Sequence, residues 1–314
     1  MRLDKPPTAG PDREPEPDER AVVAWVADMG CALSSQVHAQ FGQGRSLSTT
    51  QRQLRRLWEA GWLARFALHG SDGGTPPLAY APLALDLREP EALLAARRAI
   101  HATAWIQALD RAIGGKVLRS QGRERSQLRP ALPGRDRIGA LRATELGLPP
   151  GRHLHGLLPE RFDPVRPDAT LQVQPAAGAR VELLLDFEER PGSAPSARKL
   201  ERYDHLLGGW CTTLARYRQA GPPLVVVICP DRDSARDLCR LADPLLTCAH
   251  AHARERPEDW PYPGRARLLF AAEPDIHLGL PRALRVPALP PEVRARPRVG
   301  GSRAFEPLAV ALPG

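Results

Sequence analysis

The stretch from Ser48 to Leu63 constrains the fold most, because its pattern is that of one complete helix with a start, two faces and an end. A hydroxyl of Ser48 or Thr49 can accept from the first free backbone N–H groups, so either residue is expected as the N-cap. Gly61 lies just past the expected end, where a left-handed residue closes the last turn. Apolar residues recur at helical spacing along one face. They are Leu54, Leu57 and Trp58.

The other face of this helix, with the residues just upstream, is polar and rich in arginine. Its members are Arg45, Thr50, Arg52, Gln53, Arg55 and Arg56, with the acidic Glu59 at the end. Arg and Gln can contact base edges, and Arg and Thr can hold phosphates, so one hypothesis is a DNA recognition helix. The alternative is a solvated arginine-rich face, and these residues by themselves favour it.

The charge of the whole chain permits nucleic acid as a partner without requiring it. The net charge is +8 over 314 residues, with a pI of about 9.8. Only three of the 44 basic residues are lysines: Lys5, Lys116 and Lys199. The abundance of Ala, Arg, Pro and Gly is typical of a GC-rich genome, which weakens the arginine excess as evidence. A retained lysine is more informative, because Arg is always charged and shaped as a fork.

Cysteine usage and hydropathy indicate the compartment. The five cysteines contain no CxxC pair, and the first twenty residues are polar and proline-rich rather than a secretion signal. No apolar run approaches the roughly 20 residues needed to cross a bilayer. The sequence therefore predicts a soluble cytoplasmic protein with reduced thiols and no membrane partner.

Around the first helix the pattern predicts a winged helix-turn-helix domain at residues 20–87. Residues 1–19 are expected to be a disordered leader, because they are proline-rich and charged. Helices are expected at 20–29, 34–41 and 48–60, and strands at 62–68 and 78–83 around a Gly/Pro turn. In such a domain the third helix enters the major groove of double-stranded DNA, and Arg65 and His69 of the wing approach the backbone.

The rest of the chain predicts a restriction-endonuclease-like α/β domain at 88–285, giving an α+β protein overall. A long helix at 89–113 is expected to act as a linker, a dimer element or the first helix of this domain. Strands are expected at 116–118, 169–174, 180–187, 224–229 and 267–271, and helices at 197–219 and 234–241. Within 120–165 the sequence predicts at most a short helix near 123–128. The Pro/Arg-rich tail at 286–314 is expected to be mobile.

Acidic residues at two strand ends form the candidate catalytic site. Asp168 opens one predicted strand, and Asp186 and Glu188 lie at the end of the next. Strand pairing would bring Asp168 and Asp186 to one Mg²⁺, which could activate water against a phosphodiester. In the nuclease motif P-D…(D/E)-x-K the lysine follows the second acid by two residues, where this chain has Glu188. Lys199 of the following helix could replace it. The alternative is ordinary strand-end acids paired with Arg190 and Arg198.

Two further constellations favour structural interpretations. Cys248, His250 and His252 alternate as zinc ligands on a strand would, as do His153 and His155. Without a second pair at zinc-site spacing, they are better explained as Ala-His repeats in an alanine-rich chain. Tyr203 is predicted to pack in the core rather than act as a nucleophile, because the histidine triad usual in relaxases is missing.

Several motifs resemble the replication-relaxation family of plasmids and other mobile elements. These motifs are "LRRLWEAGWLAR", "IHATAWIQAL", "LRSQGRERSQLR", "RPDATLQV", "VELLLDFEER" and "RKLERYDHLL", spread over roughly residues 20–230. Family members show a P-D-A strand, a strand ending in Glu-x-Asp, and a helix with Lys-Leu-x-x-Tyr. The matching positions are Pro167–Ala169, Asp186–Glu188 with the two acids exchanged, and Lys199–Tyr203.

The resemblance implies a DNA-binding protein that acts in replication, relaxation or transfer together with proteins of that machinery. The second domain would be a metal-dependent nickase, a dimer scaffold or a partner platform. The competing hypothesis is a transcriptional regulator whose second domain is catalytically inactive and serves dimerisation or partner binding. A protein-interaction adaptor is the third class.

Overall fold

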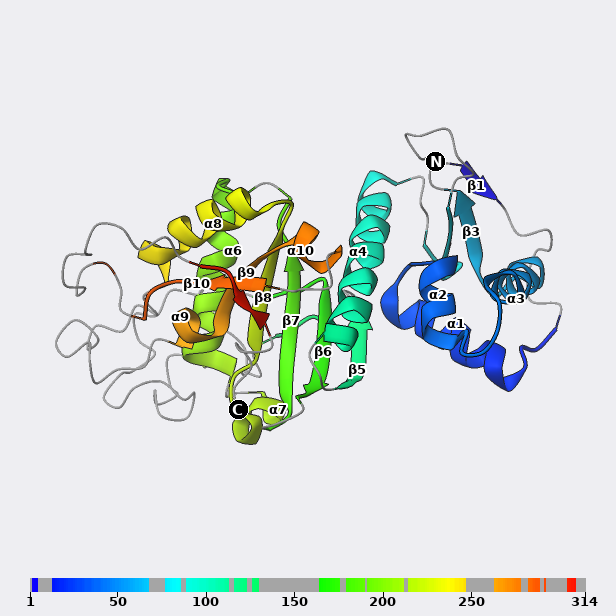
Figure 1. Ribbon diagram of the computed structural model, residues 1–314, viewed down its shortest axis with the longest axis horizontal. Coiled ribbons are helices and arrows are strands. Elements are labelled where there is room, and N and C mark those ends of the chain that lie inside the picture. Colours follow the sequence, from blue (N-terminus) through cyan, green and yellow to red (C-terminus); the bar gives the residue numbers. More distant parts are fainter. Residues whose placement is uncertain are drawn as a thin grey trace, which may run out of the picture. The chain divides into compact units, whose positions relative to one another are not determined.

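The chain is a mixed α+β protein that divides into two compact units (Figure 1). The structure is a computed structural model that describes residues 2–4, 13–67, 77–85, 89–112, 116–122, 126–129, 164–175, 179–189, 191–211, 214–246, 263–277, 282–288, 291 and 304–308. The first unit comprises Met1–Ala108 with Ser120–Ser126, and the second comprises Leu109–Arg119 with Gln127–Gly314.

The N-terminal part of the first unit consists of helices α1 to α3 and a small antiparallel sheet. The helices are α1 (Pro17–Met29), α2 (Ser34–Phe41) and α3 (Leu47–Glu59). The sheet has the strand order β1-β3-β4-β2. Its strands are β1 (Arg2–Asp4), β2 (Ala32–Leu33), β3 (Ala64–Ala67) and β4 (Leu78–Ala81). The three helices and the strand pair that follows occur in the order expected from the sequence.

Helix α3 is held by its apolar face and closed at both ends. Leu54 and Leu57 are fully buried in a core that also contains Val22 and Val37. The N-cap is Ser46 rather than the predicted Ser48 or Thr49, and its hydroxyl accepts from the Thr49 N–H at 3.3 Å. At the other end Gly61 has a φ of 73°, as the sequence predicted.

The predicted leader is partly folded, which corrects the expectation of disorder for residues 1–19. Arg13 donates two hydrogen bonds of 2.8 Å to the buried carboxylate of Glu19, and Trp62 Nε1 donates to the Arg13 carbonyl at 2.7 Å. The bonds from Arg13 lower the pKa of Glu19 below its usual value. Strand β1 also pairs with β3. Composition could not show this, because it reveals neither the contacts of Arg13 with Glu19 and Trp62 nor the pairing of β1 with β3.

The long helix α4 (Pro90–Ala112) lies largely in the first unit, so the division differs from the boundary predicted at residue 87. Gln36 Nε2 donates to the Ile100 carbonyl at 2.7 Å, and Gln107 Nε2 donates to the Gln36 carbonyl at the same distance. Ala96 and Ala99 pack with Phe66 in one apolar cluster. The short side chains of α4 allow this close approach.

The second unit is built on a seven-stranded mixed sheet with the order β11-β10-β9-β8-β7-β6-β5. Strands β7, β8 and β9 are parallel, while β6 and β10 pair antiparallel with β7 and β9. The bounds are β5 (Lys116–Gly122), β6 (Ala169–Gln174), β7 (Val181–Phe187), β8 (Leu224–Cys229), β9 (Leu268–Ala272), β10 (Arg282–Arg285) and β11 (Glu306–Pro307). Every residue of β8 is buried, as expected for a central parallel strand.

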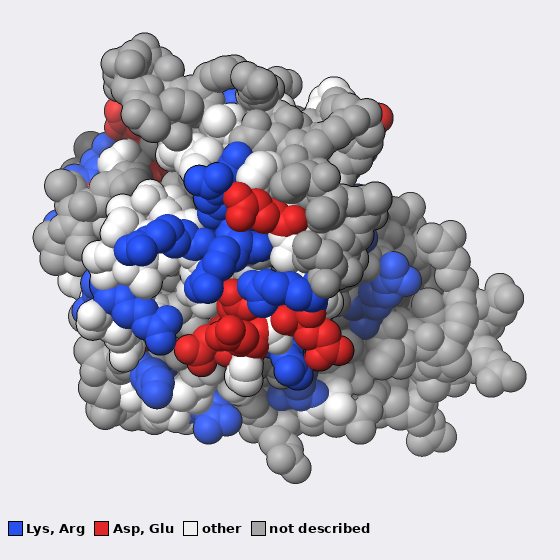
Figure 2. Space-filling view, turned by 90° about the vertical axis from the view of Figure 1, so that its right-hand side faces the viewer, with Lys and Arg blue, Asp and Glu red and all other residues white. Residues whose placement is uncertain are grey.

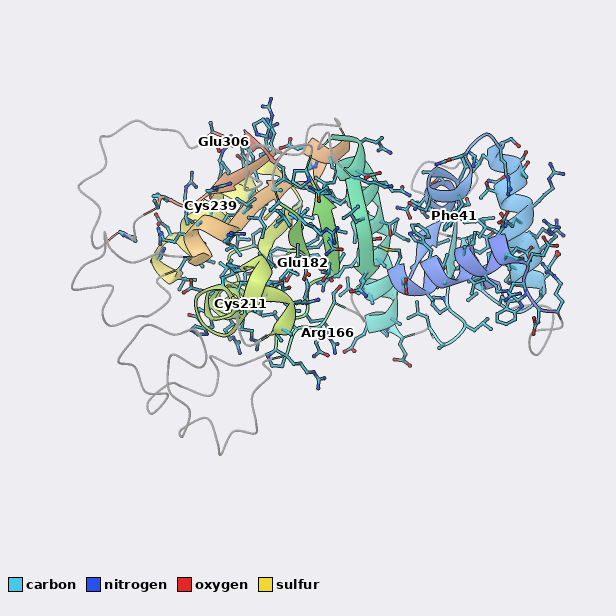
Figure 3. All side chains as sticks on the ribbon, turned by 90° about the horizontal axis from the view of Figure 1, so that it is seen from below. Phe41, Arg166, Glu182, Cys211, Cys239 and Glu306 are labelled. Atoms are coloured by element: carbon cyan, nitrogen blue, oxygen red, sulfur yellow. The ribbon has the colours of Figure 1, made fainter. Side chains whose placement is uncertain are left out.

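The helices of this unit are more broken than the sequence predicted. They are α6 (Ala194–His205), the π-helical turn η4 (Leu206–Trp210), α7 (Ala215–Ala220), α8 (Arg232–Leu245), α9 (Pro263–Arg267) and α10 (Glu273–His277). The single helix expected at 197–219 is interrupted where Gly208 and Gly209 lower helix stability. Cys211, Cys229 and Cys239 of this unit are buried, as is Cys31 of the first unit. Cys211 and Cys239 are labelled in Figure 3.

Two other segments differ from expectation. Leu128 forms an antiparallel bridge with Val165 through hydrogen bonds of 2.9 and 3.1 Å, so it is extended rather than helical. The tail expected to be mobile contributes β11, which pairs with β10, and Leu308 is buried. In both cases the stabilising contact is with a distant segment, which local sequence patterns do not reveal.

Candidate functional site

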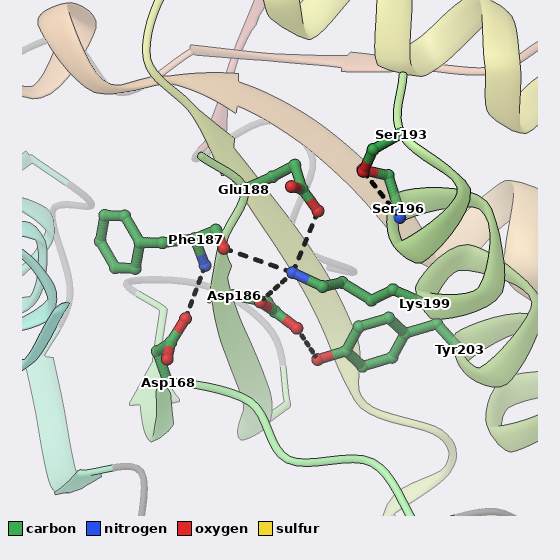
Figure 4. A network of polar contacts seen from close by, with 8 residues as sticks. All are labelled: Asp168, Asp186, Phe187, Glu188, Ser193, Ser196, Lys199 and Tyr203. Atoms are coloured by element: carbon green, nitrogen blue, oxygen red, sulfur yellow. Dashed lines mark hydrogen bonds and ion pairs between the residues drawn. The ribbon is translucent and has the colours of Figure 1, made fainter. Parts of the chain in front are cut away.

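The candidate acidic residues meet where β7 ends and β6 begins (Figure 4). Because β6 and β7 are antiparallel and Ala169 is opposite Leu185, Asp168 lies beside the end of β7. The Asp168 N–H donates to the Leu185 carbonyl at 2.8 Å, and its Oδ2 accepts from the Phe187 N–H at 2.8 Å. Asp168 therefore holds the strand end in place through the backbone.

Lys199 of α6 joins the other two acids. Its Nζ donates to Asp186 Oδ1 at 2.8 Å and lies 3.1 Å from Glu188 Oε2. It also donates to the Phe187 carbonyl at 3.3 Å. Helix α6 starts at a Ser193 cap, which fixes its first turn beside the strand end. Three oxygen atoms of consecutive residues thus converge on one ammonium group (Figure 4).

Tyr203 completes the network from the same helix. Its hydroxyl donates to Asp186 Oδ2 at 2.7 Å, so both oxygens of that carboxylate have a partner. Lys199 and Tyr203 are four residues apart and therefore share one face of α6. The predicted packing role is incomplete, because the ring is buried in the core while the phenol contacts the acidic site. The i, i+4 spacing from the rare lysine was the signal that could have revealed it.

The network is well removed from water. Asp168, Asp186 and Glu188 are all buried, and the Lys199 side chain is 27% exposed. Burial works against the Lys199 charge, but Asp186 and Glu188 outweigh it and raise the pKa of Lys199 above its usual value. Asp186 and Glu188 pair with this lysine, whereas Arg198 is exposed and Arg190 lies outside the described residues.

The donor chemistry fits a divalent cation only in part. Two carboxylates and a backbone carbonyl are oxygen ligands of the kind that Mg²⁺ prefers. The point on which they converge is, however, held by the Lys199 ammonium, and Asp168 faces a backbone N–H. Within the described part of the chain, no group of three or more His, Cys, Asp or Glu residues is placed to hold a metal ion.

The predicted DNA-contacting residues fall into distinct environments. Arg52, Arg55 and Arg56 of α3 are exposed, and Arg55 pairs with Glu59 at 2.7 Å. Gln53 is half-buried. Thr50 is a correction, because its side chain is buried, with a hydrogen bond of 2.9 Å to His38 Nδ1, and so does not face a phosphate in solvent.

The remaining predicted contacts flank this helix. The guanidinium of Arg65 stacks 3.6 Å from the centre of the Trp58 ring, and Arg45 lies 3.3 Å from the Asp18 carboxylate. His69 lies outside the described residues, as do Cys248, His250, His252, His153 and His155. Figure 2 faces the side of the first unit that carries α3, where Lys and Arg residues gather with Asp and Glu residues directly beside them.

Comparisons with known proteins leave the family open. No protein-family model and no curated protein matches the chain. A solved structure of the restriction endonuclease FokI is similar at 10% identity over 71% of this chain and 39% of that one, with a TM-score of 0.23. A TM-score this low defines no common fold. None of the helices in the described ranges is long and apolar enough to span a membrane.

Proposed function

We propose that the protein binds double-stranded DNA through α3, with the first unit acting as a winged helix-turn-helix domain. The observation that carries this proposal is the division of α3 into an apolar face, on which Leu54 and Leu57 are fully buried, and a face with three exposed arginines. The helix order and the antiparallel β3–β4 pair that follows support the proposal, because a winged helix has its elements in the same order. An α-helix fits the major groove, and a flanking strand pair can approach the backbone.

On this proposal the arginines that contact DNA differ in how firmly neighbouring residues orient their side chains. Arg52 donates a hydrogen bond of 3.4 Å from Nε to the Ser48 carbonyl, and its terminal nitrogens would contact base edges or phosphates. Arg55 and Arg65 are oriented by Glu59 and Trp58, which suits fixed phosphate contacts. We further propose a cytoplasmic role in replication, relaxation or transfer of a mobile element, with double-stranded DNA and proteins of that machinery as partners.

Replacing Arg52, Arg55 and Arg56 together by Ala should weaken binding to duplex DNA and flatten its salt dependence. If the three contact phosphates, the slope of log K against log salt should decrease in magnitude by about 2.7, since each contact contributes about 0.9. Fluorescence anisotropy over a salt series measures both effects. The matched control replaces three arginines of the second unit, the exposed Arg198 and Arg240 and the half-buried Arg236. An equal loss of DNA affinity in both variants would mean that the effect depends on the net charge of the protein rather than on α3.

The network around Lys199 supports a second candidate function, metal-dependent DNA nicking by the second unit. Asp186 and Glu188, with Asp168 nearby, would hold Mg²⁺, which when bound supplies a Lewis acid and an activated water. Lys199 would move from its present position and place its ammonium against the scissile phosphate, while Tyr203 keeps Asp186 oriented. The alternative is an inactive nuclease-like unit in a transcriptional regulator, in which the same network stabilises the sheet edge and serves dimerisation or partner binding.

Incubation of supercoiled plasmid with the protein and Mg²⁺ or Mn²⁺ separates these functions. Nicking should convert the plasmid to open circles, and Asp186→Asn should slow this at least about a hundredfold, the effect typical of losing one group that stabilises a transition state. Asp237→Asn, an exposed acid of α8, is the matched control. Intact plasmid with wild-type protein under both metals would favour the regulator.

A further inference from the structure

Four acidic residues within six positions lie next to the proposed DNA-binding face. The acidic segment, residues 14–19, has the sequence Glu-Pro-Glu-Pro-Asp-Glu. Glu14, Glu16 and Asp18 are exposed, while Glu19 is buried. The segment leads into the first turn of α1, which begins at Pro17. Its exposed carboxylates therefore have a defined position on the first unit.

Several bonds fix this segment to the domain. Glu19 accepts two hydrogen bonds from Arg13, and the Arg13 carbonyl accepts one from Trp62, which follows α3. Arg20 Nε donates to the Pro15 carbonyl at 3.0 Å. These contacts hold the segment close to the C-terminal end of α3. On this face of the first unit acidic and basic residues lie side by side (Figure 2).

One of the arginines expected to contact DNA already pairs with the segment. Arg45 lies 3.3 Å from the Asp18 carboxylate, and both side chains are well exposed. The pKa of Glu19 is lowered first by its bonds to Arg13 and in smaller part by the positive charge of Arg56. Both Arg45 and Arg56 are among the residues expected to contact DNA. The carboxylates of the acidic segment thus lie near arginines that would attract the phosphates of DNA.

We propose that the acidic segment is a built-in competitor that weakens DNA binding by α3. A phosphodiester can displace Asp18 from Arg45, because exposed ion pairs are weak and easily exchanged. The carboxylates remain in place after displacement and repel the phosphates over about 8 Å at physiological ionic strength. Binding would become tighter whenever the segment is neutralised. This regulation rests on the proposed DNA-binding function of α3.

The test replaces Glu14, Glu16 and Asp18 by Gln, Gln and Asn, which keeps the hydrogen-bond acceptors and removes three charges. Affinity for a labelled duplex should rise about tenfold at low salt, and the gain should shrink as salt screens the carboxylates. The control applies the same charge change to Glu201, Asp233 and Asp237, which are exposed in the second unit. Fluorescence anisotropy at about 50 and 200 mM salt measures both variants.

The outcomes distinguish the two proposals. A larger gain in the segment variant than in the control supports competition. Equal affinity of wild type, segment variant and control overturns the competitor while leaving DNA binding intact. Absence of binding in all three proteins overturns both proposals. In an Arg45→Ala background the gain from Asp18→Asn should be smaller than in wild type, and an unchanged gain would contradict a contact through Arg45.

Discussion

Replacing Lys199 by Met should lower the free energy of unfolding by about 3–5 kcal/mol, the range found when one partner of a buried ion pair is removed. The ammonium is shared by Asp186 and Glu188, both buried, and also donates to the Phe187 carbonyl. Methionine has a similar length and leaves these oxygens without that donor. Urea or thermal denaturation with a two-state fit measures the loss.

The neighbouring residue on α6 provides the control. Arg198 is exposed, so Arg198→Met should change stability by less than about 0.5 kcal/mol. A loss below about 1 kcal/mol for Lys199→Met would mean that the carboxyl groups are compensated in another way. The pH dependence follows from the raised pKa of Lys199: its contribution is complete below the unfolded-state pKa of about 10.4 and is lost as pH rises through the folded-state pKa.

The same variant tests whether the site can hold a metal ion. Without the ammonium, Asp186 and Glu188 are left to a competing cation, so Mg²⁺ or Mn²⁺ should raise the melting temperature of Lys199→Met more than that of wild type. The rise should depend on metal concentration. If the metal ions changed the melting temperatures of the two proteins equally, the carboxylates would have a structural role, and metal-dependent nicking would lose its support.

The parts of this site that depend on local sequence patterns were predictable, whereas those that depend on tertiary packing were not. The strands that carry Asp168 and Asp186 were predicted from alternation and apolar runs, and their pairing followed from the order of elements. Lys199 stood out as a rare lysine on the next helix. Tyr203 is predicted to pack in the core because the histidine triad usual in relaxases is missing, yet its hydroxyl donates to Asp186. The direction of a phenol is set by tertiary packing.

The misassigned residues share one cause. Thr50 lies on the polar side of a helical projection, but the neighbouring α2 presents His38 to it. Arg13 and Glu19 lie in a proline-rich, charged stretch. The Arg13 carbonyl nevertheless accepts a hydrogen bond from Trp62, and Glu19 is buried. In each case a polar group is hydrogen-bonded inside the fold, whereas local periodicity indicates only whether a face is apolar.

Arginine content likewise does not show which arginines are buried, and the second large effect is expected at the buried Arg265. Arg265→Met should lower the free energy of unfolding by about 3–5 kcal/mol. Arg265 is 2% exposed, and its guanidinium pairs with the Asp243 carboxylate. It also donates to the carbonyls of Pro287, Asp243 and Leu246 at 2.7, 2.7 and 3.0 Å. Methionine would leave these acceptors buried without a donor.

Arg265→Lys should restore only part of this loss, because one ammonium cannot span acceptors that surround a planar fork. The matched control is Arg240→Met, an exposed arginine of α8 whose pair with Asp237 is solvated. Equal stability of Arg265→Lys and wild type would show that charge, rather than fork geometry, stabilises the end of α8. That result would contradict the requirement for a planar guanidinium group at position 265.

The effect of Arg265→Met should also extend to the candidate site. Helix α9 approaches α6 so closely that a Cβ on Gly264 would lie 2.3 Å from Asp204 Oδ1, and α6 carries Lys199 and Tyr203. Loosening α9 should therefore increase amide hydrogen exchange in α6 together with α9, since neighbouring elements tend to open as one cooperative unit. Exchange that rises in α9 while α6 stays protected would mean that the site is supported by the strand end of β7 rather than by the helices behind it.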